Sequence, residues 1–154
     1  MNRVVIALDY NPSAEKVAEA GYAIAKAMNA TVAIVHVIAD AAWYAADYSP
    51  IMGYKGGYTS GAMEVIADIK TEAENYLAAT AKHLGGDNND ITTAVLDGET
   101  GPAVLKFCEA WAAGLIVTGS HRHHGLERVF GTDTAMYILK HATIPALVVP
   151  TGDK

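Results

Sequence analysis

The sequence has very little cysteine, no long hydrophobic run and no excess of basic residues, and each shortage excludes a class of protein. Cys108 is the only cysteine among 154 residues, so no disulfide can form within the chain, and a reducing compartment is expected. A buried, apolar cysteine fits its helical surroundings. No segment is long enough in apolar residues to span a bilayer, and the apolar run near the N-terminus is too short for a secretory signal. We therefore expect a cytoplasmic protein.

The charge balance excludes further partners. The chain has 11 Lys and Arg against 17 Asp and Glu, a formal net charge of -6. Proteins that bind nucleic acid or anionic membranes present a basic face, so we expect neither partner. The chain also lacks the Gly-Lys-Ser/Thr of a phosphate-binding loop, a Ser-His-Asp order and a pair of catalytic carboxylates. It is therefore not expected to be an enzyme with rapid turnover, and slow ATP hydrolysis is the most that it would support.

Strand-like and helix-like segments alternate along the chain. Five short apolar runs predict strands, at 4–8, 31–38, 91–96, 115–118 and 146–150. Helical patterns fall between them, at 13–28, at 63–84, after a cap at Thr100, and at 132–141. Asn29, which tolerates the left-handed conformation, is expected to end the first helix, and Tyr76 lies on the apolar face of the second. Asp40 to Gly61 is predicted as a long connection. This order predicts an α/β fold with one open, parallel, doubly wound sheet and helices on both faces, formed by a single domain over 1–154.

The polar residues that follow the first and fourth strands are the first candidates for a site. Ligands of such sheets bind beyond the carboxyl ends of the strands, where the strand order reverses. If these two strands are neighbours, Asp9 and Gly119 flank one crevice. The glycine-bearing segment from Gly119 to Thr132 joins a strand to a helix, an arrangement typical of a phosphate site. Asp9 could instead be a turn residue that bonds its own backbone.

Several motifs, in this order, make the chain similar to one known family. They lie at 4–9, 35–37, 48–53, Gly98, 115–120 and 140–149. With them the chain resembles the universal stress protein family over essentially its whole length. The resemblance implies a five-stranded sheet in the order 3-2-1-4-5. It also implies a homodimer that pairs through the last strand, Ala146 to Pro150, which would otherwise be an exposed edge.

One branch of that family binds ATP through a glycine signature in the loop after the fourth strand, and the other branch lacks it. Gly119 and the pair Gly131 and Thr132 match the signature, and Gly125 matches a glycine that is common in the loop. Arg122, however, replaces the second glycine of the signature, and the loop is one residue short. Asp133 stands where a small apolar residue is usual. A side chain in place of glycine restricts the backbone, whereas an arginine can pair with a phosphate. The carboxylate of Asp133 favours the helix but repels phosphate.

The resemblance therefore implies a regulatory, stress-response protein that binds ATP or another adenine nucleotide, with Mg²⁺ accompanying the phosphates. The alternative is a member that binds no nucleotide and acts as a dimeric interaction module. The nucleotide-binding residues that the resemblance implies are Ala7, Asp9, Val37, Gly119, Ser120, Arg122, Gly125, Gly131, Thr132 and Thr134.

The same loop carries three histidines, His121, His123 and His124. Imidazole is a common metal ligand, but no cysteine or carboxylate pair completes a site here, so a solvated polar loop is favoured and no metal site is predicted. The alternative is a pH-sensitive loop that attracts an anion when its histidines are protonated.

Overall fold

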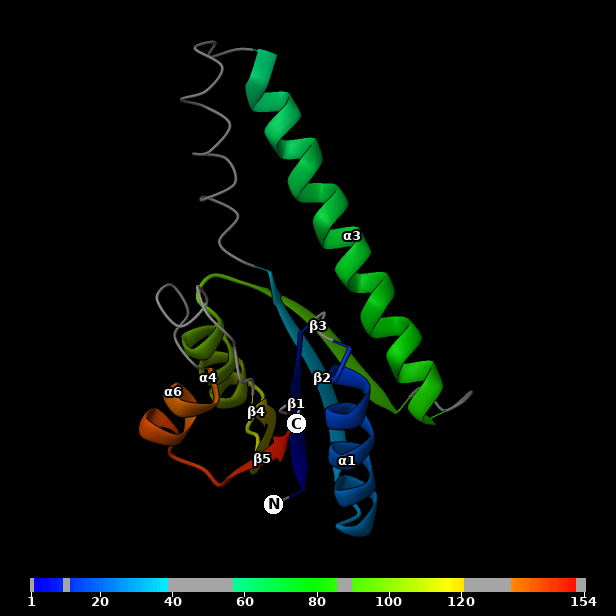
Figure 1. Cartoon of the computed structure of the whole chain (residues 1–154), viewed down its shortest axis with the longest axis vertical. Coiled ribbons are helices and arrows are strands. Elements are labelled where there is room, and N and C mark those ends of the chain that lie inside the picture. The colour runs from blue at the N-terminus through cyan, green and yellow to red at the C-terminus, as the bar shows by residue number, and fades with distance from the viewer. Residues whose placement is uncertain (1, 10–11, 39–56, 86–89, 121–133, 152–154) are drawn as a thin grey trace.

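Five runs rich in β-branched residues form a parallel sheet in a computed structural model of the chain. The strands are β1 (Arg3–Leu8), β2 (Thr31–Ile38), β3 (Ile91–Asp97), β4 (Leu115–Ser120) and β5 (Ala146–Pro150). Their order is β3-β2-β1-β4-β5, and each neighbouring pair is parallel. The predicted doubly wound sheet and its strand order are confirmed. The structure describes residues 2–9, 12–38, 57–85, 90–120 and 134–151 (Figure 1).

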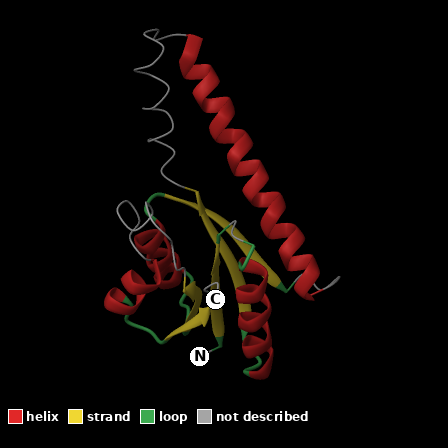
Figure 2. Ribbon diagram, viewed as in Figure 1, coloured by secondary structure: helices red, strands yellow, loops and turns green. Residues whose placement is uncertain are grey.

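Helices cover both faces of this sheet. They are α1 (Ala14–Ala27), α3 (Gly57–Gly85), α4 (Thr100–Ala110) and α6 (Thr134–His141). Figure 2 shows α1 and α3 on one side of the sheet and α4 and α6 on the other. Such two-sided cover explains why the strands are apolar along most of their length instead of alternating. Among the described residues, no helix is both long and apolar enough to cross a membrane.

Alternate residues of the central strands belong to two separate apolar cores, one on each face of the sheet. On the α1/α3 face, Ile6 and Ile34 pack with Leu77 of α3, and all three are fully buried. On the α4/α6 face, Val5 packs with Val104 and Ile138 in the same way. Adjacent residues of β1 therefore point to opposite faces, as the pleat of a strand requires.

Glycines allow the closest approaches of helices to their neighbours. A methyl group on Gly21 of α1 would lie 2.8 Å from Cδ1 of Ile6. A methyl group on Gly101 of α4 would lie 2.7 Å from Cγ of Tyr137 on α6. These separations are too short for carbon atoms, so α1 sits close to the sheet, and α4 close to α6, because no side chain intervenes.

Element ends differ from the sequence expectations at several points. The helix expected from residue 63 begins at Gly57, so the connection expected to reach Gly61 ends earlier. Glycine weakens a helix by about 1 kcal/mol but does not forbid one. Thr100 is the first residue of α4 rather than its cap, which is Glu99. Asn29 has a φ of 53°, which confirms the left-handed turn expected after the first helix.

Candidate functional site

The strand order reverses between β1 and β4, and these two strands part toward their carboxyl ends. Their register pairs Val4 with Leu115 and continues only as far as Ile6 with Val117. Beyond that point each strand stays paired with its outer neighbour, β1 with β2 as far as Leu8 and β4 with β5 as far as Ser120. Open α/β sheets bind ligands where two central strands separate in this way. The adjacency on which the sequence argument depended is thus confirmed.

Candidate residues lie at the ends of both separating strands. Asp9 directly follows β1 and is half-buried, while Gly119 and Ser120 are the last residues of β4. The sequence had placed these two in the loop, but β4 continues through them. The Thr151 hydroxyl donates to the carbonyl oxygen of Ser120, and the Thr151 N–H donates to Ser120 Oγ at 3.3 Å. Ser120 is therefore held at the strand end, and its own hydroxyl hydrogen does not take part in either bond.

A buried histidine and a tyrosine fix the backbone at the end of β1. Nδ1 of His36, on β2, lies 2.7 Å from the carbonyl oxygen of Leu8, and a carbonyl can only accept, so Nδ1 carries the hydrogen. The Tyr76 hydroxyl, on α3, donates to the carbonyl oxygen of Asp9 at 2.7 Å. The two rings meet edge to face, with centroids 5.9 Å apart. Two successive carbonyls before the β1–α1 connection are thereby held in place.

Sequence reasoning missed this pair. His36 was read only as part of a strand motif, and Tyr76 only as one residue on the buried face of a helix. The signal that could have found it is a histidine in an otherwise apolar strand. His36 is only 6% exposed, and a buried imidazole requires a hydrogen-bond partner.

Two small apolar residues, Ala7 of β1 and Val37 of β2, lie on the α4/α6 face of the sheet. Ala7 is half-buried and Val37 is buried, and both belong to the core on that face. They come from the neighbouring strands β1 and β2, near the carboxyl ends. Together they form an apolar surface near the end of β1, the kind of surface that a nucleobase packs against.

The remaining predicted residues divide into two groups. Thr134 is the first residue of α6 and is half-buried. The others lie outside the described residues, and their roles stay predictions; they are Arg122, Gly125, Gly131 and Thr132, together with His121, His123 and His124.

Comparison with known families decides how the chain is classified. Residues 1–150 match the model of the universal stress protein family. The chain belongs to the universal stress protein family. This universal stress protein is 29% identical over 153 residues to universal stress protein MJ0531 of Methanocaldococcus jannaschii, covering 99% of the chain and 84% of the relative. It is 30% identical over 146 residues to universal stress protein A homolog 1 of Coxiella burnetii, covering 95% of the chain and 94% of the relative.

Solved structures share the fold of this universal stress protein at low sequence identity. The protein MJ0577 has a TM-score of 0.75 at 18% identity, over 99% of this chain and 98% of that one. A universal stress protein in complex with cAMP has a TM-score of 0.60 at 18% identity, over 98% of each chain. One from Archaeoglobus fulgidus in complex with dAMP has a TM-score of 0.57 at 16% identity, over 96% and 97%.

Proposed function

We propose that this universal stress protein binds ATP or another adenine nucleotide where β1 and β4 part, and that it acts as a regulator in a stress response. The separation of these strands, with Asp9 after one and Gly119 near the end of the other, is the observation that carries the proposal. The solved relatives in complex with cAMP and dAMP add support. Those ligands share adenine, a sugar and a phosphate with ATP, so adenine recognition is the feature to test first.

Each part of the nucleotide has a chemically suitable partner. Ala7 and Val37 offer an apolar wall for adenine, and the Asp9 carboxylate accepts hydrogen bonds from sugar hydroxyls. The N–H group of Gly119 and the hydroxyl of Ser120, with Thr134 at the start of α6, suit the phosphates. From the sequence, Gly125, Gly131 and Thr132 would extend this phosphate site, and Arg122 would pair with phosphate oxygens. Mg²⁺ would be held by those phosphates and by water.

His36 and Tyr76 act in this proposal as positioning residues. They hold the carbonyl oxygens of Leu8 and Asp9, so they fix where the chain leaves β1. A site assembled from two strand ends depends on such support, because small displacements of binding groups weaken binding.

Dimerisation through β5 is the second part of the proposal. Within the described strands, β5 pairs only with β4, and Ala146, Leu147 and Val148 are partly exposed. An edge strand of this kind is satisfied by pairing with a second copy. Sedimentation equilibrium of the full chain distinguishes a dimer from a monomer, and a monomer at micromolar concentration contradicts this part.

The nucleotide proposal is tested on the purified full chain. Denaturation should release an adenine nucleotide, identified by chromatography and mass. ATP at about a hundred times its dissociation constant should stabilise the native state by about 2.7 kcal/mol. For a chain of 154 residues, that corresponds to a rise in Tm of about 5 to 10 °C. AMP and cAMP should give smaller rises in Tm, and GTP should give none.

A matched pair of variants locates the site. Asp9→Ala should weaken ATP binding about ten-fold or more, since a hydrogen bond to a charged group is worth about 1.5 to 3 kcal/mol. Asp97→Ala removes an acid from the end of the edge strand β3 and should leave binding unchanged. If no nucleotide co-purifies and millimolar ATP leaves Tm unchanged, the chain is instead the dimeric interaction module without nucleotide. ATP hydrolysis that is lost in Asp9→Ala would show a slow ATPase.

A further inference from the structure

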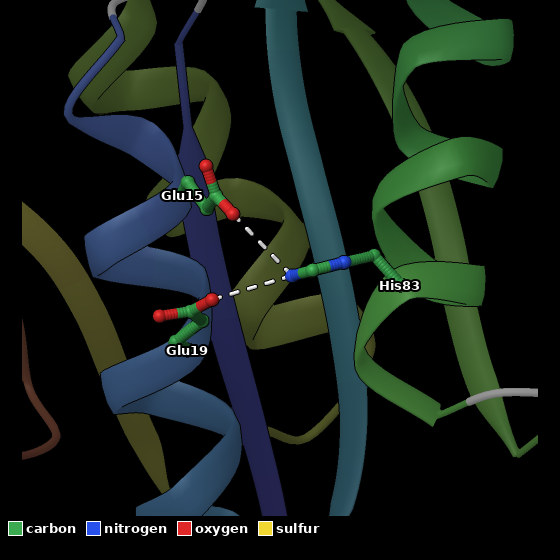
Figure 3. Close-up of side chains that lie close together, drawn as sticks. All are labelled: Glu15, Glu19 and His83. Carbon is green, nitrogen blue, oxygen red and sulfur yellow. Dashed lines mark hydrogen bonds and ion pairs between the residues drawn. The ribbon is translucent and has the colours of Figure 1, made fainter.

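Three ligand-type side chains converge between α1 and α3, on the opposite face of the sheet from the apolar wall of the proposed nucleotide site. Glu15 and Glu19 project from α1 toward His83 in the last turn of α3 (Figure 3). Nε2 of His83 lies 3.4 Å from Oε1 of Glu15 and 3.2 Å from Oε1 of Glu19. All three ligand atoms lie within 4.8 Å of one another.

The helical repeat explains why the two carboxylates share one side. Residues four apart on a helix lie one above the other, so Glu15 and Glu19 both face α3 once α1 packs against the sheet. Buried residues of α1, including Val17 and Gly21, fix that rotation. His83 reaches the pair from a helix 64 residues away in the sequence.

The distances from His83 to the two carboxylates fit neighbouring ligands of a tetrahedral metal centre. Zinc bonds of about 2.0 to 2.1 Å at tetrahedral angles place neighbouring ligand atoms about 3.3 Å apart. The two distances from His83 Nε2, 3.4 and 3.2 Å, fall on either side of that value. An ion could therefore bind His83 Nε2 together with either carboxylate oxygen at these separations.

The electrostatics of the cluster require a hydrogen or a metal ion between the three atoms. When His83 is neutral, with Nε2 unprotonated, the lone pair of Nε2 faces two carboxylate oxygens, and three electron-rich atoms within reach of one another repel. Either a proton on Nε2 or a metal ion relieves this repulsion. The side chains are 56 to 67% exposed, so water can complete the coordination of an ion.

We propose that Glu15, Glu19 and His83 form a binding site for a divalent transition-metal ion of the zinc class. Imidazole with carboxylates suits Zn²⁺ and Co²⁺ better than Mg²⁺ or Ca²⁺, which prefer oxygen ligands alone. Three protein ligands leave a coordination position for water. The ion would hold the first part of α1 against the end of α3, and this proposal does not require that a nucleotide binds.

The proposed metal site lies next to the hydrogen bond from the Tyr76 hydroxyl to the Asp9 carbonyl oxygen. A groove of about 240 Å³ between α1 and α3 is lined by Glu15 and His83 and also by Ala18, Tyr76, Ala79 and Thr80. Tyr76 is the residue that holds the Asp9 carbonyl, and His83 follows it two turns later on α3. Metal binding therefore restrains the helix that carries this contact.

The test is a titration of the untagged full chain with Co²⁺, followed by its visible absorption, and with Zn²⁺, followed by calorimetry. His121, His123 and His124 are all changed to Gln in the starting protein, so that these closely spaced histidines contribute no binding. One equivalent of each ion should bind, and Zn²⁺ should raise Tm. His83→Gln, Glu15→Gln and Glu19→Gln should each weaken binding at least about ten-fold, the lower end of the range for weaker, second-layer changes at metal sites.

Two control variants separate this site from general surface binding. His141→Gln removes another exposed histidine in a last helical turn, on α6, and Glu74→Gln removes another exposed acid of α3. Neither should change affinity or the rise in Tm. Circular dichroism checks that each variant is folded, as is expected of exposed positions. If neither ion binds, or if binding is the same after His83→Gln, the cluster is an ion pair between two helices and the proposal is wrong.

Discussion

On one face of the sheet, α1 and the long helix α3 lie against each other and against the strands; on the other, α4 and α6 leave a hollow of about 550 Å³. Lys106, Cys108, Ile116, Tyr137 and Ile144 are among its lining residues. The first face carries the polar contacts, namely the His36 and Tyr76 bonds to β1 and the cluster around His83. The second face carries exposed apolar side chains, Met136 at 47% and Leu139 at 54%.

The difference shows how one sheet can serve two purposes. The α1/α3 face carries hydrogen bonds that fix the end of β1, where the proposed nucleotide site begins. The α4/α6 face ends next to the edge strand β5 and keeps apolar surface open, which suits contact with a second copy. Three predictions test whether the faces differ in this way.

The largest expected effect comes from truncating the core on each face. Leu77 of α3 and Ile138 of α6 are both fully buried. Leu77→Ala should lower the free energy of unfolding by about 3 to 5 kcal/mol, whereas Ile138→Ala should cost about 2 to 3 kcal/mol. The reason is that α6, with 8 residues, can move toward a cavity more easily than the longer helix α3, which packs against β2, β3 and α1. Urea unfolding at one fixed protein concentration measures the free energy of unfolding of both variants. Equal losses would contradict the proposed difference between the faces.

A smaller effect is expected from the polar contact on the α1/α3 face. Tyr76→Phe removes the hydroxyl that donates to the Asp9 carbonyl and should cost about 1 kcal/mol. Tyr22→Phe is the matched control, because Tyr22 is a half-buried tyrosine on α1 of the same face, with its ring under the Lys26 ammonium. That control should leave the free energy of unfolding nearly unchanged. A similar loss in both variants would mean that the hydroxyl of Tyr76 has no special role at the end of β1.

The smallest effect concerns Cys108, which lines the hollow on the α4/α6 face but is only 4% exposed. Burial raises the pKa of the Cys108 thiol from 9.0 to about 11. The unfolded chain therefore loses this proton near pH 9 while the folded chain keeps it, so this contribution to stability is complete below pH 9 and is lost as the pH rises to 11. At pH 9.5 the loss is about 0.8 kcal/mol.

Urea unfolding at pH 8 and pH 9.5, in the wild type and in Cys108→Ala, isolates that contribution. Between pH 8 and pH 9.5, the free energy of unfolding of the wild type should fall by about 0.8 kcal/mol more than that of the variant. The substitution also creates a cavity, but the stability lost to that cavity is the same at both pH values and cancels when the two pH dependences are compared. Equal pH dependences would mean that water in the hollow reaches the thiol.

Much of the fold could be read from the chain because it depends on local chemistry. Runs of Val and Ile marked the strands, and Asn29 marked a left-handed turn that the structure contains. The start of α3 at Gly57 and the cap at Glu99 could not be read in the same way. At both ends the intrinsic preferences of the residues are weak, and packing of the rest of the helix decides where it begins.

The candidate site was also predictable from the sequence only in part. The sequence placed Asp9 and Gly119 beside one crevice on the condition that the first and fourth strands are neighbours. The parallel pairing of β1 with β4 meets that condition. The bonds from His36 to Leu8 and from Tyr76 to Asp9 join residues 28 and 67 positions apart. No local pattern contains information over such separations.

By itself, the sequence determined the alternation of strands and helices, the lack of a second cysteine for a disulfide within the chain, and the polar residues that end the strands. These follow from the period and chemistry of neighbouring residues. Only the tertiary structure decided that β1 and β4 part after Ile6, that His36 and Tyr76 hold the end of β1, and that His83 meets Glu15 and Glu19. The physical reason is that packing on the two faces of the sheet fixes the rotation and position of each helix, and so decides which distant side chains meet.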